Sequence, residues 1–249
     1  MKRLRDFENW TVMGRDGQDI GPVKDFYLDD ERWVVRYLLT DAGGWLATNP
    51  VLISPVAIDR LDWESSRVHV DLTREQVRNA PQLSTDDRID RAFEAAYFGY
   101  YGYPQYWVGP HAWGPVPMPT RVATAAPGVE PVKASDFGGE GRLRGVNDVS
   151  GHHIQALDGE IGHVEDFLVD TESWSVRYLV IDTSNWIGGK TVLVSPEWVR
   201  RVDWKDRLIF IDLTRDGIKE SPEYDPTFEI TREYEDRLYR YYRRPVYWE

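Results

Sequence analysis

The stretch Trp33-Val34-Val35-Arg36-Tyr37-Leu38-Leu39-Thr40-Asp41 decides the fold, because a close copy of it returns later in the chain. The copy reads Trp174-Ser175-Val176-Arg177-Tyr178-Leu179-Val180-Ile181-Asp182. A run of β-branched and aromatic residues that ends in an acidic residue is typical of a strand covered on both faces. We therefore expect each copy to be the central strand of one unit. Its Trp, Val and Tyr side chains should alternate along one face, with Leu38 or Leu179 on the other.

The two copies belong to a longer internal repeat. A shift of 141 residues aligns Ile20–Trp107 with Ile161–Trp248 without a gap, and 34 of the 88 aligned residues are identical. A match of this length indicates a tandem duplication. We expect a first unit at residues 1–107, a linker at 108–145 that is rich in Pro, Gly and Ala, and a second unit at 146–249.

Each repeat carries the pattern of a mainly β domain with accessory helices. Asp16-Gly17 and Asp158-Gly159 are signals of tight hairpin turns. Six short antiparallel strands at this spacing predict a small closed barrel in each repeat. The expected strands of the first repeat are 9–13, 20–26, 33–41, 51–55, 58–62 and 68–72, and those of the second are 154–157, 161–167, 174–182, 192–196, 199–203 and 209–213.

A helix is expected to follow each barrel. Thr73 and Thr214 are plausible caps of a short helical turn, and a longer apolar stripe comes after it. The stripe consists of Ile89, Phe93, Ala96, Tyr97 and Tyr100 in the first repeat, and of Ile230, Tyr234, Leu238, Tyr241 and Tyr242 in the second. We expect each helix to pack on its own barrel or on the other copy.

Composition excludes several classes of protein. The net charge of −12 argues against nucleic acid as a partner, because its phosphates are bound largely through Lys and Arg. The chain has no cysteine, so disulfides, thiolate nucleophiles and cysteine metal sites are ruled out. No window reaches the roughly 18 apolar residues of a membrane span, and residues 1–6 lead into polar sequence rather than a signal peptide. We expect a cytoplasmic protein without an integral membrane segment.

Several motifs together resemble a known family. They are Asp158-Gly159-Glu160-Ile161-Gly162, then Val176-Arg177-Tyr178-Leu179-Val180, then Val192-Leu193-Val194-Ser195-Pro196. This pattern resembles the PRC-barrel family, which is named for the cytoplasmic domain of the H chain of the purple-bacterial photosynthetic reaction centre and includes the C-terminal domain of a ribosome-maturation factor. The Tyr-rich segments 96–102 and 239–242 look like the helical end of the H-chain domain. The resemblance implies two tandem PRC-type barrels and, as one possible role, an accessory protein that supports a membrane electron-transfer complex.

The sequence contains no catalytic constellation. None of the five histidines forms an i, i+4 pair on an expected helix, so we expect no metal site and no cofactor. Arg36 and Arg177 lie in apolar strands and need carboxylate partners if they are buried. We interpret Arg36 with Asp62, and Arg177 with Asp203, as candidate structural ion pairs, with a proton-handling or anion site as the alternative.

The aromatic ends of the two repeats are the candidate interaction surface, because such residues left in water would expose much apolar area. They are Tyr100, Tyr101, Tyr106, Trp107, Tyr241, Tyr242, Tyr247 and Trp248. The same surface used twice suits a self-complementary contact, so we expect the repeats to pack on each other or the chain to form a homodimer.

The sequence therefore predicts a non-enzymatic interaction or adaptor module with an unidentified protein partner. The competing hypothesis is a small-molecule-binding protein or enzyme with a site between the two barrels, lined by Trp or Tyr.

Overall fold

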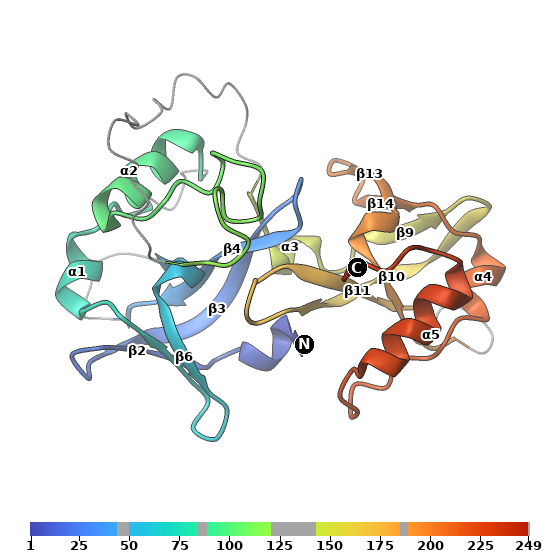
Figure 1. The fold of residues 1–249 in the computed structure, drawn as a ribbon, viewed down its shortest axis with the longest axis horizontal. Helices are drawn as coiled ribbons and strands as arrows, with labels where there is room; N and C mark the ends of the chain where they lie inside the picture. Colours follow the sequence, from blue (N-terminus) through green and yellow to red (C-terminus); the bar gives the residue numbers. More distant parts are fainter. Residues whose placement is uncertain (44–49, 84–88, 121–142, 185–188, 249) are drawn as a thin grey trace. The chain divides into compact units, whose positions relative to one another are not determined.

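Strands β4 (Val34–Asp41) and β11 (Val176–Asp182) lie inside their sheets rather than at the centre, each next to the terminal strand of the order. In the computed structural model, which describes residues 1–43, 50–83, 89–120, 143–184 and 189–248, β4 pairs with β3 on one side and β5 on the other (Figure 1). Leu38 lies opposite Phe26 and Ile53, and Leu179 lies opposite Phe167 and Val194. Leu38 and Leu179 on one face, and Tyr37 and Tyr178 on the other, are all fully buried, which confirms that both faces are covered.

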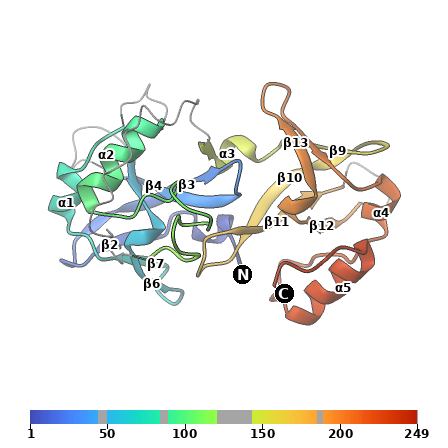
Figure 2. The same cartoon turned by 45° about the horizontal axis from the view of Figure 1, so that its top comes forward.

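The chain is mainly β and forms two sheets of seven strands within the described residues. The first runs in the order β5-β4-β3-β2-β7-β6 and the second in the order β12-β11-β10-β9-β14-β13. Strands of both sheets are labelled in Figure 2. The other strands of the first sheet are β2 (Thr11–Gly14), β3 (Asp19–Asp29), β5 (Pro50–Ile53), β6 (Ile58–Asp62), β7 (Arg67–Val70) and β8 (Leu143–Gly145). Those of the second are β1 (Lys2–Arg3), β9 (His153–Ala156), β10 (Gly159–Val169), β12 (Thr191–Val194), β13 (Val199–Asp203) and β14 (Leu208–Ile211).

One pairing in each sheet departs from the antiparallel pattern. β2 pairs with β7, and β9 with β14, in parallel. The reason lies after β5 and β12, where Ser54 and Ser195 cap single 3-10 turns at Pro55–Ala57 and Pro196–Trp198. These turns carry the chain onward without the reversal of a hairpin, which sets the direction of every later strand.

Trp33 and Trp174 are not strand residues, and their predicted place on a strand face was wrong. Both have left-handed backbone conformations, with φ of 53° and 57°. The Trp33 amide donates to the Asp29 carbonyl at 2.8 Å, so this tryptophan closes the turn that precedes β4. Positive φ is uncommon for a bulky residue, and the strand patterns gave no sign of it.

Gly21 and Gly162 show why the Ile-Gly pair recurs in both repeats. Each has a positive φ, and an added Cβ would lie 2.0 Å from the Asp41 carbonyl oxygen or 2.1 Å from that of Asp182. Only glycine allows this close approach of the two backbones.

The predicted helices, a short one and a long one, follow β7 and β14. The short helices are α1 (Arg74–Asn79), α3 (Val146–Val149) and α4 (Arg215–Lys219), the long ones are α2 (Arg91–Tyr101) and α5 (Arg232–Tyr242), and a 3-10 helix, η1, spans Leu4–Phe7. Of these, α3 and η1 were not predicted. Thr73 and Thr214 cap α1 and α4, as expected.

The predicted apolar stripes were only partly right. Of α2, the buried residues are Glu94, Tyr97 and Phe98, whereas Ala96 and Tyr100 face solvent. Of α5, they are Glu235, Leu238 and Tyr239. The buried face of each helix therefore includes a glutamate and does not coincide with the predicted apolar stripe.

The chain divides into two compact units whose boundaries differ from the repeats. The first unit comprises Asp6–Asn147 and Thr171–Ser175, and the second comprises Met1–Arg5, Asp148–Asp170 and Val176–Glu249. The first unit thus contains the turn before β11, and the second contains β1. Residues 108–120, assigned to the linker from sequence, belong to the first unit, where Trp113 is buried and Met118 is exposed.

Candidate functional site

A buried glutamate from helix α2 is the centre of a polar cluster in the first unit. Glu94 lies on α2 and is 2% exposed. Its Oε1 accepts hydrogen bonds from the Tyr37 hydroxyl of β4 at 3.2 Å and from the Tyr106 hydroxyl at 2.7 Å. Its Oε2 lies 2.8 Å from Nη1 of Arg91, one turn earlier on the helix. Sheet, helix and aromatic end thus converge on one carboxyl group.

Burial dominates the titration of this group. It raises the pKa of Glu94 to about 7, although the Arg91 charge and the two tyrosine hydrogen bonds act in the opposite direction. A carboxyl group with such a pKa can hold or release a proton near neutral pH. Burial also raises the pKa of Tyr37 and Tyr106, so both phenols stay protonated and donate.

The second unit repeats the cluster with the aligned residues. Glu235 of α5 is 2% exposed and accepts from the Tyr178 hydroxyl at 2.8 Å and the Tyr247 hydroxyl at 2.9 Å. Arg232 lies 3.0 Å from its Oε2. We call these two clusters the carboxyl clamps: Tyr37, Arg91, Glu94 and Tyr106 in one unit, and Tyr178, Arg232, Glu235 and Tyr247 in the other.

A buried arginine extends the first clamp. Arg36 is fully buried, its Nη2 donates to Asp29 Oδ2 at 2.8 Å, and its Nη1 donates to the Ala112 carbonyl at 2.5 Å. The guanidinium lies 3.7 Å from the centre of the Tyr106 ring and 5.0 Å from that of Trp113. The cation is therefore paired and stacked, as a buried charge must be.

Arg177 has a similar but more open place. Its Nη2 donates to Asp170 at 3.2 Å, its guanidinium lies 4.3 Å from the Tyr247 ring, and its side chain is 27% exposed. The first unit differs because residues 108–120 bring Trp113 and the Ala112 carbonyl onto Arg36.

The predicted ion pairs form with other partners. Arg36 pairs with Asp29 and Arg177 with Asp170, seven residues earlier across the preceding turn. Asp62 instead accepts from the Glu64 and Ser65 amides in the turn after β6 and lies 3.6 Å from Arg60. Hydrogen bonds from the Ser65 side chain and then from the Ser65 amide lower the pKa of Asp62. Asp203 accepts from the Asp206 amide in the matching turn and lies 3.5 Å from Arg201.

The eight residues of the predicted interaction surface differ in burial. Tyr106 is buried, and Tyr101, Trp107, Tyr242, Tyr247 and Trp248 are half-buried against their own unit. Trp107 contacts Phe98 with ring centres 5.4 Å apart, and Trp248 contacts Tyr239 at the same distance. Tyr100 and Tyr241 remain exposed, at 43% and 38%. A role of these residues in binding a partner stays a prediction.

The clamp glutamates were missed from sequence because a charged residue on an amphipathic helix is usually placed on its solvated face. The signal that could have found them is identity between the repeats. Arg91, Glu94 and Tyr106 all recur, as Arg232, Glu235 and Tyr247, in segments where most neighbours differ.

Comparison with known proteins gives the family. The model of the PRC-barrel domain matches residues 1–77 and 145–218, both repeats of the chain. The chain belongs to the PRC-barrel domain family. The chain therefore contains two PRC-barrel domains in tandem, as the sequence motifs predicted. The long helices α2 and α5 and the aromatic ends, which supply the clamp glutamates, lie outside the matched ranges.

One relative is an uncharacterized protein of Deinococcus radiodurans, which is 38% identical over 77 residues. The match covers 30% of this chain and 27% of the relative. This likeness adds no activity, substrate or partner to the family assignment.

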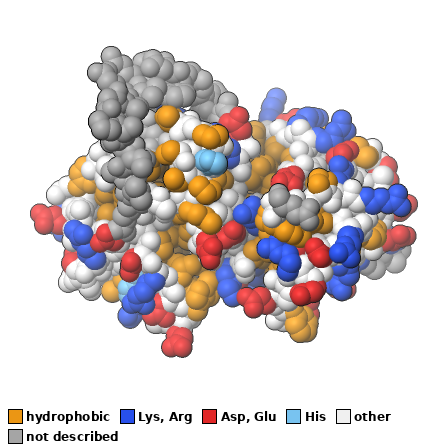
Figure 3. All heavy atoms as spheres, viewed as in Figure 1, with side chains coloured by type: hydrophobic (Ala, Val, Ile, Leu, Met, Phe, Trp, Pro, Cys, Tyr) orange, Lys and Arg blue, Asp and Glu red, His pale blue; other side chains and the backbone are white. Residues whose placement is uncertain are grey.

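The described part of the PRC-barrel chain shows neither a metal centre nor a helix that could span a membrane. Those residues contain no group of three or more His, Cys, Asp or Glu side chains placed to hold a metal ion. None of the helices in the described ranges has the length and apolar run that crossing a bilayer requires. On the face drawn in Figure 3, Lys and Arg side chains are scattered among acidic ones rather than gathered in one stripe.

Proposed function

We propose that this protein is a non-enzymatic interaction module that presents the same aromatic surface twice. The proposal rests on the exposed and fixed side chains of Tyr100 and Tyr241. These two aligned residues are 43% and 38% exposed, yet their hydroxyls are held by the carbonyls of Gln76, at 2.9 Å, and Gly217, at 2.8 Å.

A tyrosine held in this way is well suited to bind a protein. Its ring is presented in one orientation, so little rotamer entropy is lost on contact. Tyrosine is enriched among the residues that contribute most to protein interfaces. Two copies on one chain can also raise the avidity for a partner with two matching sites.

The carboxyl clamps support the non-enzymatic part of the proposal. Glu94 and Glu235 are hydrogen-bonded to the chain's own tyrosines and paired with its own arginines. Their hydrogen bonds join the long helix and the aromatic end of each unit to its sheet, which is a structural role. An accessory role at a membrane electron-transfer complex, implied by the H-chain resemblance, stays a prediction.

Affinity capture from the native cells tests the proposal. Wild-type protein is compared with the double variant Tyr100→Ser/Tyr241→Ser, and a matched control replaces Phe228, which is 72% exposed, by Ser. We expect a protein that is enriched by the wild type and by the Phe228 variant but lost with the double variant. Equal recovery with all three proteins would contradict the role of the two tyrosines.

A further inference from the structure

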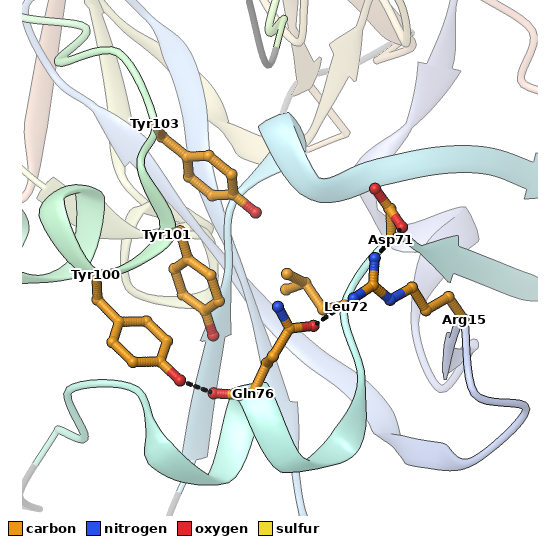
Figure 4. Close-up of a pocket in the computed structure, with 7 residues that line it drawn as sticks. All are labelled: Arg15, Asp71, Leu72, Gln76, Tyr100, Tyr101 and Tyr103. Atoms are coloured by element: carbon orange, nitrogen blue, oxygen red, sulfur yellow. Dashed lines mark hydrogen bonds and ion pairs between the residues drawn. The ribbon is translucent and has the colours of Figure 1, made fainter. Parts of the chain in front are cut away.

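A pocket in the first unit lies beside the end of α2. Its volume is about 390 Å³, at the small end of ligand pockets (Figure 4). It is lined by Arg15, Asp71, Leu72, Gln76, Tyr100, Tyr101 and Tyr103. These residues come from the turn after β2, the segment between β7 and α1, helix α1, the end of α2 and the residues after it.

One wall of the pocket is formed by three polar side chains that are hydrogen-bonded to each other, Asp71, Arg15 and Gln76. Arg15 Nη1 lies 3.1 Å from Asp71 Oδ1, and its Nη2 donates to Gln76 Oε1 at 3.4 Å. The Arg15 backbone amide donates to the Leu72 carbonyl at 2.9 Å, so the arginine is anchored at both ends. Since a cation and an anion offset each other here, the wall favours neither a cationic nor an anionic ligand.

The opposite wall carries two unsatisfied phenols. Tyr101 and Tyr103 stack with ring centres 5.2 Å apart and an angle of 13° between their planes. Their hydroxyl oxygens are buried and find no hydrogen-bond partner among the described residues. Figure 4 shows these hydroxyls directed toward the side of Gln76 and Asp71. Burial raises the pKa of both phenols, so they remain donors, and a buried donor without a partner is a costly arrangement.

The second unit lacks the second of these two phenols. Arg244 stands where the first repeat has Tyr103, and its Nη2 donates to both the Asp212 carboxylate and the Asp212 carbonyl at 2.8 Å. Gly217 replaces Gln76, while Tyr241 keeps the contact that Tyr100 makes. The unsatisfied phenol at position 103 and the amide of Gln76 are thus specific to the first unit.

We propose that this pocket binds a small uncharged ligand rich in hydroxyl groups, of the saccharide or polyol class. Such a ligand accepts from the Tyr101 and Tyr103 hydroxyls and donates to Asp71. The planar groups of Asp71 and Gln76 suit paired hydrogen bonds with neighbouring hydroxyls, and the tyrosine rings supply the apolar contact for its C–H groups. A ligand of one or two sugar rings suits the volume. The pocket shares Tyr100 with the proposed partner surface, but its test leaves Tyr100 and Tyr241 unchanged, so either proposal can fail without the other.

Saturation-transfer NMR on the full chain tests the proposal. The probes are glucose, maltose, trehalose and sorbitol, with inorganic phosphate and choline as charged comparators. We expect transfer to at least one of the four neutral probes and none to the charged ones. The double variant Tyr101→Phe/Tyr103→Phe should keep its fold, because it loses only unsatisfied hydroxyls, and should bind about tenfold more weakly or worse.

Two further variants make the test specific. Tyr103→Arg introduces the residue of the second unit and should abolish binding, whereas Tyr242→Phe, the matched hydroxyl removal in the second unit, should leave it unchanged. The proposal is overturned if no neutral probe receives transfer, or if phosphate or choline binds instead. It is also overturned if the double phenylalanine variant binds as tightly as the wild type.

Discussion

At the scale of single residues, the structure depends on charged groups that the fold has enclosed and paired. Glu94 is held by two phenols and one guanidinium, and Arg36 by one carboxylate, one carbonyl and two aromatic rings. Removing one member of such a set leaves the others buried without a partner, which costs more than the contact itself contributes.

The titration of Glu94 gives a prediction with a definite sign. The folded protein binds its proton with a pKa of about 7, whereas the ordinary value is 4.5. Between these values the folded state holds more protons than the unfolded state, so stability falls as pH rises through this window. Glu94→Gln cannot titrate there. We expect the stability of the wild type, relative to this variant, to fall by about 1–3 kcal/mol from pH 5 to pH 8.

Urea denaturation of both proteins at the two pH values measures this difference. Glu75→Gln, which changes an exposed carboxylate of α1, is the control and should show a much smaller shift relative to wild type. A Glu94 variant that tracks the wild type across the whole window would show that this carboxyl group keeps its ordinary pKa.

Leu179 gives a second prediction at this scale. It is fully buried between the two neighbours of β11, so Leu179→Ala should destabilise the second unit by about 2–5 kcal/mol through lost contacts and a cavity. Leu157→Ala removes the same atoms from a side chain that is 53% exposed and should cost no more than about 0.5 kcal/mol. Thermal melting of the two variants distinguishes them, and equal melting temperatures would refute the assignment of Leu179 to the core.

At the scale of elements, periodicity predicted six strands and a helix in each repeat because buried faces recur at fixed intervals. The strands predicted at 51–55 and 192–196 end in Pro55 and Pro196, and these prolines lie in the 3-10 turns that follow β5 and β12. Periodicity could not predict that the following turn keeps the chain direction, nor that Trp33 and Trp174 adopt a left-handed conformation. It also could not name Asp29 as the partner of Arg36, since that pairing depends on how a turn brings neighbouring strands together. The carboxyl clamps and the pocket need side chains from three or more elements, which no local pattern contains.

The turn at Trp174 leads to a prediction about an element far from it in sequence. Trp174 belongs to the first unit and is 2% exposed, with its ring centre 5.8 Å from that of Phe7 and 6.3 Å from that of Phe26. Its carbonyl accepts from the Val35 amide at 2.8 Å. Trp174→Ala should therefore loosen β3 and β4 of the first repeat, although the substitution lies in the second.

Hydrogen exchange followed by mass spectrometry locates this effect. Faster exchange is expected in peptides that cover Phe26 and Val35, with much smaller changes in β12–β14. Trp204→Ala, in the turn between β13 and β14 and outside the first unit, is the control. If Trp174→Ala changed only peptides of the second repeat, the assignment of residues 171–175 to the first unit would be wrong.

At the scale of the whole molecule, each seven-stranded sheet is completed by a segment that comes before the other repeat in the sequence. β8, which precedes the second repeat, pairs with β3. β1, which precedes the first repeat, pairs with β10. The contacts at these segments correspond: the Asn147 amide donates to Asp25 at 3.1 Å, and the Arg5 amide donates to Asp166 at 3.3 Å. The duplicated chain is therefore made of two units that neither repeat could complete from its own segments.

This exchange predicts the effect of removing residues 2–5. Lys2 and Arg3 pair with Val169 and Leu168, Leu4 is 1% exposed, and Arg5 lies 3.3 Å from Glu165. Deletion should expose the edge of β10 and destabilise the second unit, while β2–β7 of the first repeat keep their protection, because β3 is completed by β8. Hydrogen exchange of peptides that cover Leu168 and, separately, Leu28 measures the two units independently. Val146→Ala is the reciprocal variant, since Val146 is buried in the first unit, and it should loosen the peptide of Leu28 instead. If the deletion accelerated exchange at Leu28 and not at Leu168, the N-terminal segment would belong to the repeat that follows it, and the two units would each be built from one repeat alone.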